Sequence, residues 1–201
     1  MKTQSVVYVI DDDASIRKSL ERLILSVGLD VKIFSSGGDF LSYNPPDQPG
    51  CLVLDVKMPA ITGLELQEKL TALHRSIPII FITGFGNIPT SVRAMKAGAV
   101  DFLEKPFEDK TLLEAIHRAI NHDINYRQRN KELFAIRKRL ESLTKREREV
   151  FELVVTGMLN KQIAFQLGIT EKTIKVHRAR IMQKMGVQSL ADLVRQAERL
   201  K

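Results

Sequence analysis

The sequence of 201 residues contains one cysteine, Cys51, and only 11 glycines and 7 prolines. A single cysteine excludes an intrachain disulfide framework, and the low glycine and proline content excludes a low-complexity chain. No apolar run approaches the roughly 20 residues that span a bilayer. The first residues do not form a signal-peptide pattern, since three aspartates follow a run of only five apolar residues. We therefore expect a cytoplasmic protein without a membrane partner.

Charge is unevenly distributed along the chain. Residues 1–122 carry 13 lysines and arginines against 15 aspartates and glutamates, whereas residues 123–201 carry 18 against 9. The net charge is therefore −2 in the first part and +9 in the second. A basic region joined to a mildly acidic one indicates two functions. By charge alone, the basic part is either a nucleic-acid-binding domain or an ordinary solvated surface.

The first 120 residues alternate short apolar runs with amphipathic segments. The runs that predict strands are 6–10, 31–34, 51–55, 79–83 and 100–104. Helical patterns lie between them, near 14–26, 36–43, 64–74, 89–97 and 109–120. Short, nearly continuous apolar strands that alternate with helices predict an α/β fold, in which a five-stranded parallel sheet is covered on both faces. This is the doubly wound, flavodoxin-like arrangement.

Polar residues follow four of these predicted strands. Asp11 and Asp12 follow the first, Asp55 ends the third, Thr83 ends the fourth and Lys105 follows the fifth. The carboxyl ends of parallel strands share one edge of a sheet, so we expect these side chains to converge. Carboxylate oxygens bind Mg²⁺, and a neutralised aspartate can accept a phosphoryl group. The pattern therefore predicts a cation site with phosphoryl chemistry, and Asp13 is expected only to begin the following helix.

A polar segment from about 121 to 143 connects the two parts. It lacks glycine and proline, which predicts a helical connector. The apolar series that ends at Ile120 and the series that begins at Leu133 are out of register. We therefore expect a bend or hinge between about 123 and 131, and one continuous helix is the alternative.

The last 60 residues predict four helices. Thr144 and Glu147 form a capping-box pattern, and the helix that follows stops near Gly157. A helix over 160–167, a turn at Gly168 and a third helix from Thr170 form a helix-turn-helix pattern. The third helix is predicted to bury Ile174, Val176, Ile181, Met182 and Met185. Its predicted exposed face carries Lys172, Lys175, Arg178 and Lys184, with Thr173 and His177 beside them.

Residues 4–120 resemble a two-component receiver domain. The motifs that carry the resemblance are VIDDD, VLDVKMPAITGLEL, ITG and AMKAGAVDFLEKPF. The resemblance implies that Asp55 is the phosphoacceptor. It also implies that Asp11, Asp12, Asp55 and the backbone carbonyl of Lys57 bind Mg²⁺.

The same resemblance assigns roles to further residues. Thr83 matches the hydroxyl that contacts the arriving phosphoryl group, and Lys105 matches the lysine that pairs with it. Lys105 precedes Pro106 at a peptide bond that is cis in the family. Phe102 matches the aromatic switch, although a simple core position is the alternative. Lys57 and Phe85 match positions that tune the lifetime of the phosphoryl group.

Residues 137–201 resemble the LuxR-type helix-turn-helix family, on LTKREREVFELVVTGMLNKQIAFQLGITEKTIKVHRARIMQKM. Two residues depart from the family pattern. Phe165 is larger than usual, and Ala179 replaces a common basic residue between Arg178 and Arg180. That leaves open which arginine reaches a DNA phosphate.

Together the two resemblances imply a response regulator of the FixJ/NarL class, FixJ-like branch. It comprises a receiver domain (4–120), a helical linker (121–140) and an all-α, four-helix DNA-binding domain (141–201). The implied partners are a sensor histidine kinase, promoter DNA and a second copy after phosphorylation, with RNA polymerase as a further candidate. The implied DNA contacts are Lys172, Thr173, Lys175, Val176, His177 and Arg178. The only catalysis implied is self-directed phosphoryl transfer and autodephosphorylation.

Two alternatives belong to other classes. A Mg²⁺-dependent phosphohydrolase with an aspartate nucleophile would share the strand-end carboxylates, but the short loops provide no substrate-binding insertion. A DNA-binding protein whose receiver is never phosphorylated is the other alternative, and the complete set of site residues argues against it.

Overall fold

The computed structural model describes residues 5–84 and 88–200, so Phe85 lies outside the described residues. The chain divides into two compact units, Met1–Arg127 and Gln128–Lys201. Each unit has its own apolar core.

The first unit is built on a five-stranded parallel sheet in the order β2-β1-β3-β4-β5. The strands are β1 (Val6–Ile10), β2 (Asp30–Phe34), β3 (Gly50–Asp55), β4 (Ile79–Thr83) and β5 (Asp101–Glu104). The chain order reverses between β1 and β3, which makes this point the topological switch of the sheet. The predicted doubly wound α/β fold is confirmed, and the strand bounds agree with the predicted runs to within one residue at each end.

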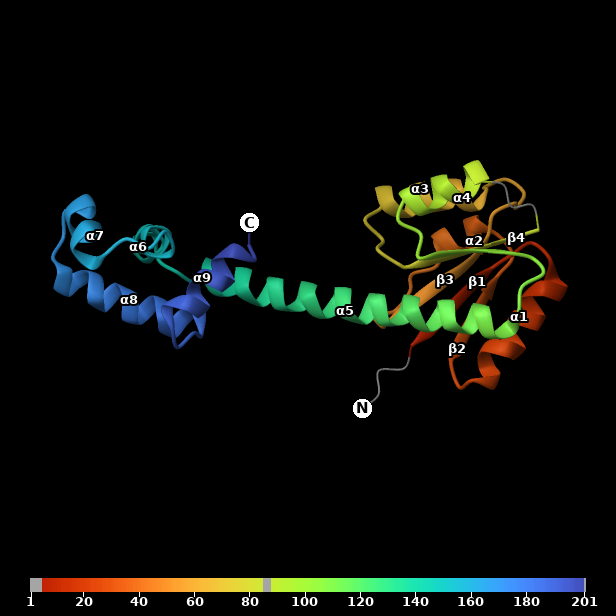
Figure 1. Ribbon diagram of the computed structural model, residues 1–201, viewed down its shortest axis with the longest axis horizontal. Helices are drawn as coiled ribbons and strands as arrows, with labels where there is room; N and C mark the ends of the chain where they lie inside the picture. The colour runs from red at the N-terminus through yellow and green to blue at the C-terminus, as the bar shows by residue number, and fades with distance from the viewer. Residues whose placement is uncertain (1–4, 85–87, 201) are drawn as a thin grey trace. The chain divides into compact units, whose positions relative to one another are not determined.

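Helices cover both faces of this sheet (Figure 1). On one face, α2 (Gly37–Ser42), α3 (Gly63–Ala72) and α4 (Ile88–Lys96) pack against alternate strand residues. On the other face, α1 (Ala14–Ser26) and α5 (Asp109–Glu141) pack against the residues between them. The strands are buried on both sides, which explains why their sequences are continuous apolar runs.

The helix starts near the carboxyl edge of the sheet are specified locally. The Asp13 side chain accepts hydrogen bonds from the backbone N–H groups of Ser15 and Ile16, as an N-cap of α1. Thr62 and Glu65 form a capping box at the start of α3. Gly63 leaves no room for a side chain, because a Cβ there would lie 2.3 Å from the Asp55 carbonyl oxygen. The start of α3 is therefore fixed directly against the end of β3.

The bend expected between 123 and 131 is wrong, since α5 is one uninterrupted helix of 33 residues. The interruption of the apolar stripe has a different cause. Asp123 is buried and accepts hydrogen bonds from the Gly50 backbone N–H at 2.9 Å and from Arg127 Nε at 2.7 Å. Arg127 also pairs with Asp47. The polar positions that broke the stripe therefore extend the packing of α5 on the first unit beyond Ile120.

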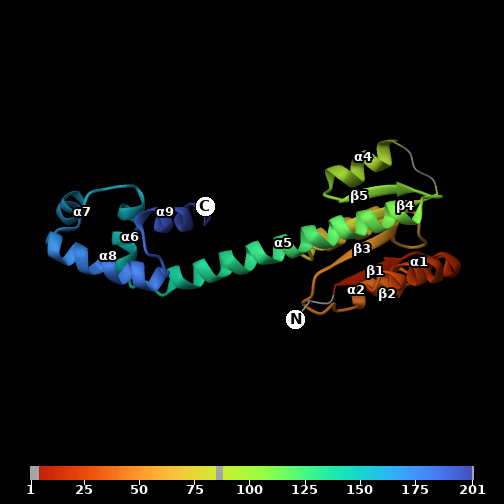
Figure 2. The ribbon, with the colours of Figure 1, turned by 60° about the horizontal axis from the view of Figure 1, so that its bottom comes forward.

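The second unit is all helical and contains α6 (Lys145–Val155), α7 (Asn160–Leu167), α8 (Glu171–Met185) and α9 (Leu190–Glu198) (Figure 2). The capping box of Thr144 and Glu147 is present as predicted. Gly168 has φ +65°, a left-handed conformation that glycine adopts readily, and it allows the tight turn between α7 and α8. The last part of α5 joins this unit through Ile136, which packs in its core. Among the described residues, no helix combines the length and the apolar character needed to cross a membrane.

Candidate functional site

Two buried carboxylates and one ammonium group meet at the carboxyl edge of the sheet. Asp11 follows β1 and Asp55 ends the neighbouring β3. Lys105 follows β5, and its Nζ lies 2.7 Å from Asp11 Oδ2 and 2.8 Å from Asp55 Oδ1. The convergence expected from the strand order is therefore present for these three residues.

Backbone groups orient the two carboxylates. The Lys57 N–H donates to Asp55 Oδ2 at 2.7 Å, and the Asp13 N–H donates to Asp11 Oδ1 at 2.9 Å. The bond between Lys105 and Pro106 is cis, as the family resemblance implied. Each carboxylate thus has a defined orientation without a long side-chain network.

Burial of Asp11, Asp55 and Lys105 removes water from their charged groups and shifts the pKa values of Asp55 and Lys105. Desolvation raises the pKa of Asp55, although the Lys105 ammonium opposes that shift. Burial also acts to lower the pKa of Lys105, but its hydrogen bonds to Asp11 and Asp55 outweigh this, and the net shift is upward. Two carboxylates and one ammonium leave one negative charge in excess. That excess is suited to binding a further cation.

The other predicted residues of this site, Thr83, Phe102 and Asp12, differ in how deeply they are buried. Thr83 is buried at the end of β4. Phe102 is half-buried in the core of the α2–α4 face, with its ring centroid 6.3 Å from that of Phe81. Asp12 is exposed beside Asp11. The position of Phe102 is compatible with a packed core residue and with a switch.

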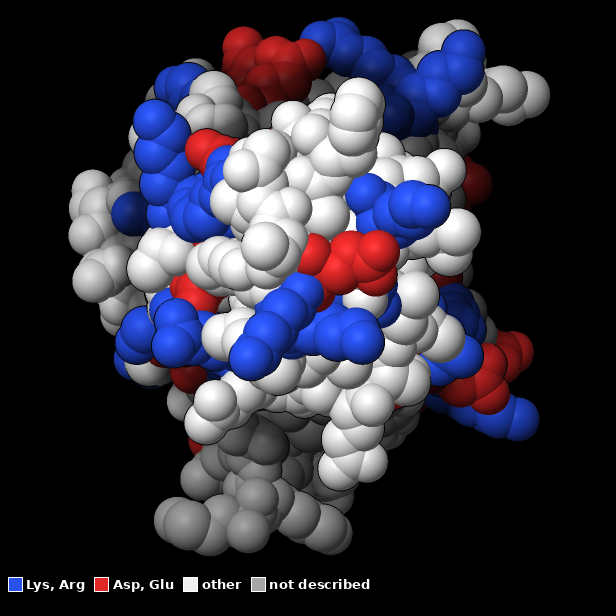
Figure 3. Space-filling model, turned by 90° about the vertical axis from the view of Figure 1, so that its left-hand side faces the viewer, with Lys and Arg blue, Asp and Glu red and all other residues white. Residues whose placement is uncertain are grey.

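The second unit presents a helix-turn-helix with a basic surface. Lys172, Lys175 and Val176 of α8 are exposed, and Val176 is 45% exposed. Thr173, His177 and Arg178 are partly buried. Figure 3 shows lysine and arginine side chains bordering a largely uncharged area on this end of the second unit. The exposed side of α8 therefore offers both positive charge and an apolar group.

Both units match known families. Residues 7–117 match the response regulator receiver domain, and residues 141–197 match the luxR family of bacterial regulatory proteins. The first match alone covers more than half of the chain. The chain belongs to the response regulator family.

Relatives of this response regulator share its full arrangement. Nodulation protein W of Bradyrhizobium diazoefficiens is 48% identical over 98% of this chain and 87% of its own. Transcriptional regulatory protein FixJ of Rhizobium meliloti is 45% identical over 97% and 96%. The solved structure of response regulator StyR is 48% identical and covers 98% of this chain and 99% of its own, with a TM-score of 0.87. The regulator is thus a transcription factor of the FixJ/LuxR type.

The donor set of the response regulator fits Mg²⁺. This ion is bound through one or two carboxylates, with waters and phosphate oxygens as its other ligands. Asp11 and Asp55 lie within hydrogen-bond distance of one ammonium, so their oxygens face a common point. No group of three His, Cys, Asp or Glu side chains in residues 5–84 and 88–200 is arranged as a metal site. The two carboxylates of Asp11 and Asp55 match the one or two that Mg²⁺ takes from a protein.

Two expectations for α8 are wrong. Val176 was expected on the buried side but is exposed, because Ile174, Ile181 and Met185 alone define the buried stripe. Lys184 was expected on the exposed face. Its Nζ instead donates to the buried Glu147 Oε2 at 2.6 Å and to the Ser142 carbonyl at 3.1 Å. The need to pair a buried carboxylate draws this lysine inward.

Sequence patterns did not identify several structurally important polar residues. Asp123 and Arg127 contact Gly50 and Asp47, more than 70 residues away in the sequence. The only local signal was their position in the stripe of α5 where apolar residues were expected.

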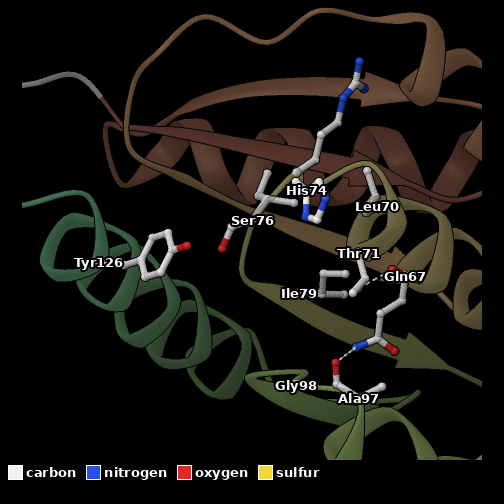
Figure 4. A pocket seen from close by; sticks show the side chains of 11 residues that line it. Gln67, Leu70, Thr71, His74, Ser76, Ile79, Ala97, Gly98 and Tyr126 are labelled. Atoms are coloured by element: carbon white, nitrogen blue, oxygen red, sulfur yellow. Dashed lines mark hydrogen bonds between the residues drawn. The ribbon is translucent and has the colours of Figure 1, made fainter. Parts of the chain in front are cut away.

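A cavity of about 320 Å³ lies at the opposite, amino edge of the sheet (Figure 4). The end of α3, the start of β4 and Tyr126 of α5 line it. Gln67 donates to the Ala97 carbonyl at 3.1 Å, and the hydroxyl groups of Tyr126 and Ser76 point toward each other in Figure 4. None of the predicted site residues that the structure describes lines this cavity. The chemistry of the regulator is therefore assigned to the carboxyl edge.

Proposed function

We propose that a sensor histidine kinase phosphorylates this cytoplasmic response regulator on Asp55, and that phosphorylation controls dimerisation and sequence-specific DNA binding. The observation that carries the proposal is the Lys105 ammonium between the Asp11 and Asp55 carboxylates. A structural ion pair needs one carboxylate, whereas phosphoryl transfer needs an acceptor, a cation site and a positive charge for the transferred oxygens.

Each group at the site has a distinct role in the transfer. An Asp55 oxygen forms a bond to phosphorus while the bond from phosphorus to the imidazole nitrogen of the kinase breaks. Asp11, Asp12, Asp55 and the Lys57 carbonyl would hold Mg²⁺, which neutralises the phosphoryl oxygens when bound. Lys105 exchanges one carboxylate partner for a phosphoryl oxygen, and the Thr83 hydroxyl donates a hydrogen bond to another phosphoryl oxygen.

The proposed switch follows from these contacts. Movement of Thr83 toward the phosphoryl group vacates space beside β5, into which the half-buried Phe102 rotates. The changed surface formed by α4, β5 and α5 then favours a dimer. A dimer presents two copies of α8 to half-sites about one helical turn of DNA apart.

The proposed DNA contacts are on α8. Lys172, Lys175 and Val176 are exposed and contact the major groove, and Thr173 and His177 flank them. The resemblance also implied Arg178, whose half-buried side chain donates to Asn160. Bound promoter DNA places the regulator beside RNA polymerase, which is a further proposed partner.

The test is the intact mass of the full chain after incubation with acetyl phosphate and Mg²⁺. We expect one added phosphoryl group, lost without Mg²⁺ and lost in Asp55→Asn. Asp47→Asn is a matched control, because the Asp47 side chain is 84% exposed and lies at the opposite edge of the sheet. An adduct that persists in Asp55→Asn would reject the assignment of the acceptor. Multiple turnover of acetyl phosphate on the time scale of its addition would favour a phosphohydrolase.

A further inference from the structure

Two arginines of α8 have different surroundings. Arg178 is half-buried, and its Nη1 donates to Asn160 Oδ1 at 2.7 Å. Asn160 is the first residue of α7. Arg180 is exposed. The two side chains are therefore not equivalent candidates for a contact with a DNA phosphate.

Helical geometry places these arginines on different faces of α8. Residues three and four apart share a face of an α-helix. Arg178 lies four residues after the buried Ile174 and three before the buried Ile181, so it borders the buried stripe. Arg180 lies four residues after the exposed Val176 and eight after Lys172. Arg180 thus shares the face that carries the proposed base contacts.

The bond between Arg178 and Asn160 has a specific geometric effect. Apolar packing of Ile163, Ala164 and Ile174 holds α7 and α8 together, but apolar contacts are not directional. A charge-assisted hydrogen bond from the flank of α8 to the start of α7 restricts rotation of α8 about its own axis. That rotation decides which bases the exposed residues of α8 face.

We infer that Arg178 is a positioning residue, which fixes the rotation of α8 through Asn160, and that Arg180 supplies the phosphate contact. This inference rests on the proposed DNA-binding function and assigns specificity within it.

The test uses the full chain after treatment with acetyl phosphate and Mg²⁺. A pool of randomised DNA duplexes is first used to select the preferred sequence of the wild type. The affinity for that selected duplex and for single-base variants of it is then measured at several salt concentrations. Log affinity falls with log salt, and the loss of one phosphate contact makes this slope shallower by about 0.9, or by about 1.8 for a dimer.

The two arginine variants are expected to differ. Arg180→Ala should make the salt slope shallower by that amount and keep the ranking of the single-base variants. Arg178→Ala should leave the slope unchanged and reduce the discrimination against mismatched bases from roughly tenfold to within about threefold. A shallower slope in Arg178→Ala with unchanged base discrimination would overturn the inference while leaving the DNA-binding function in place.

Asn160 provides a second pair of variants in case Arg178→Ala does not fold. Asn160→Ala should reproduce the loss of discrimination, whereas Asn160→Asp retains an acceptor oxygen for Arg178 and should keep the base preference. Wild-type discrimination in Asn160→Ala would overturn the inference. Failure of the wild type to select any sequence from the pool would instead overturn the proposed DNA-binding function and this inference with it.

Discussion

The two edges of the receiver sheet each carry a basic side chain between two aspartates. At the carboxyl edge, Lys105 lies between Asp11 and Asp55, both of which are buried. At the amino edge, Arg127 lies between the buried Asp123 and Asp47, whose side chain is 84% exposed. The same strand joins them, since β3 begins at Gly50, which donates to Asp123, and ends at Asp55.

The two edges differ in their balance of buried charge. At the amino edge, one buried carboxylate is matched by one guanidinium, whose planar fork holds a fixed geometry. At the carboxyl edge, two buried carboxylates share one ammonium, a compact group that can change partners without a fixed orientation. A balanced cluster fixes the packing of α5 on the sheet. The unbalanced cluster suits the cation and the phosphoryl group that we propose it takes up.

The largest effect is expected on removing the buried carboxylate of the amino edge. Asp123→Ala leaves the Gly50 N–H without its acceptor and Arg127 without its buried partner. Breaking a buried ion pair in this way costs about 3–5 kcal/mol in the free energy of unfolding. Urea unfolding followed by tyrosine fluorescence measures it, because Tyr8, Tyr43 and Tyr126 are the three tyrosines of the chain and all lie in the first unit.

Asp47→Ala is the matched control for this measurement. It removes the other carboxylate partner of Arg127, but in solvent, where an ion pair contributes about 0–1 kcal/mol. Equal losses of stability in the two variants would contradict the distinction between a buried anchor and a surface pair.

A smaller effect is expected on exchanging the guanidinium for an ammonium. Arg127→Lys keeps the charge but cannot contact Asp123 and Asp47 through two nitrogens in a fixed fork. We expect a loss of about 1–2 kcal/mol in the same unfolding experiment. Arg118→Lys is the comparison, because Arg118 pairs with Asp101 at the surface. If Arg127→Lys left the free energy of unfolding unchanged, the stability of the amino edge would not depend on the geometry of the guanidinium fork.

The smallest effect on the free energy of unfolding is expected at Glu147 of the second unit, a buried carboxylate that is paired with the Lys184 ammonium. The Lys184 ammonium and the Thr144 backbone N–H lower the pKa of Glu147. A lowered folded-state pKa means that the stabilisation is present above the ordinary value of 4.5 and is lost as the pH falls through the folded-state value. Glu147→Gln should therefore cost about 1 kcal/mol near neutral pH and less under acid conditions.

The ring signals of His177, the one histidine of the second unit, report this unfolding by NMR. Glu152→Gln, at an exposed position of α6, is the control and should leave the pH dependence unchanged. A cost of Glu147→Gln that stays constant from neutral to acid pH would reject the role of Lys184.

Much of the fold was predictable because its signals are local. The continuous apolar runs identify the strands, and the capping box at Thr144 and the glycine turn at Gly168 identify the helix boundaries of the second unit. The meeting of Asp11, Asp55 and Lys105 was also predictable, since strand order alone brings those positions to one edge.

Two of the errors have one physical origin. The pattern of apolar residues suggested a bend in α5 and an exposed Lys184, but the buried carboxylates of Asp123 and Glu147 are paired with groups distant in the sequence, and Lys184 is the partner of Glu147. Their positions follow from hydrogen bonding in the folded unit, which periodicity does not report. The bond between Arg178 and Asn160 could not be predicted for the same reason.

The anchor formed by Asp123, Arg127, Asp47 and Gly50 also bears on how such proteins can be recombined. A receiver exchanged at residue 120, where the apolar stripe ends, would take Asp123 and Arg127 from one parent and Gly50 and Asp47 from the other. A junction placed after Arg127 keeps both sides of the anchor in the same parent. The natural unit of exchange is therefore longer than the α/β pattern, and it ends inside a helix.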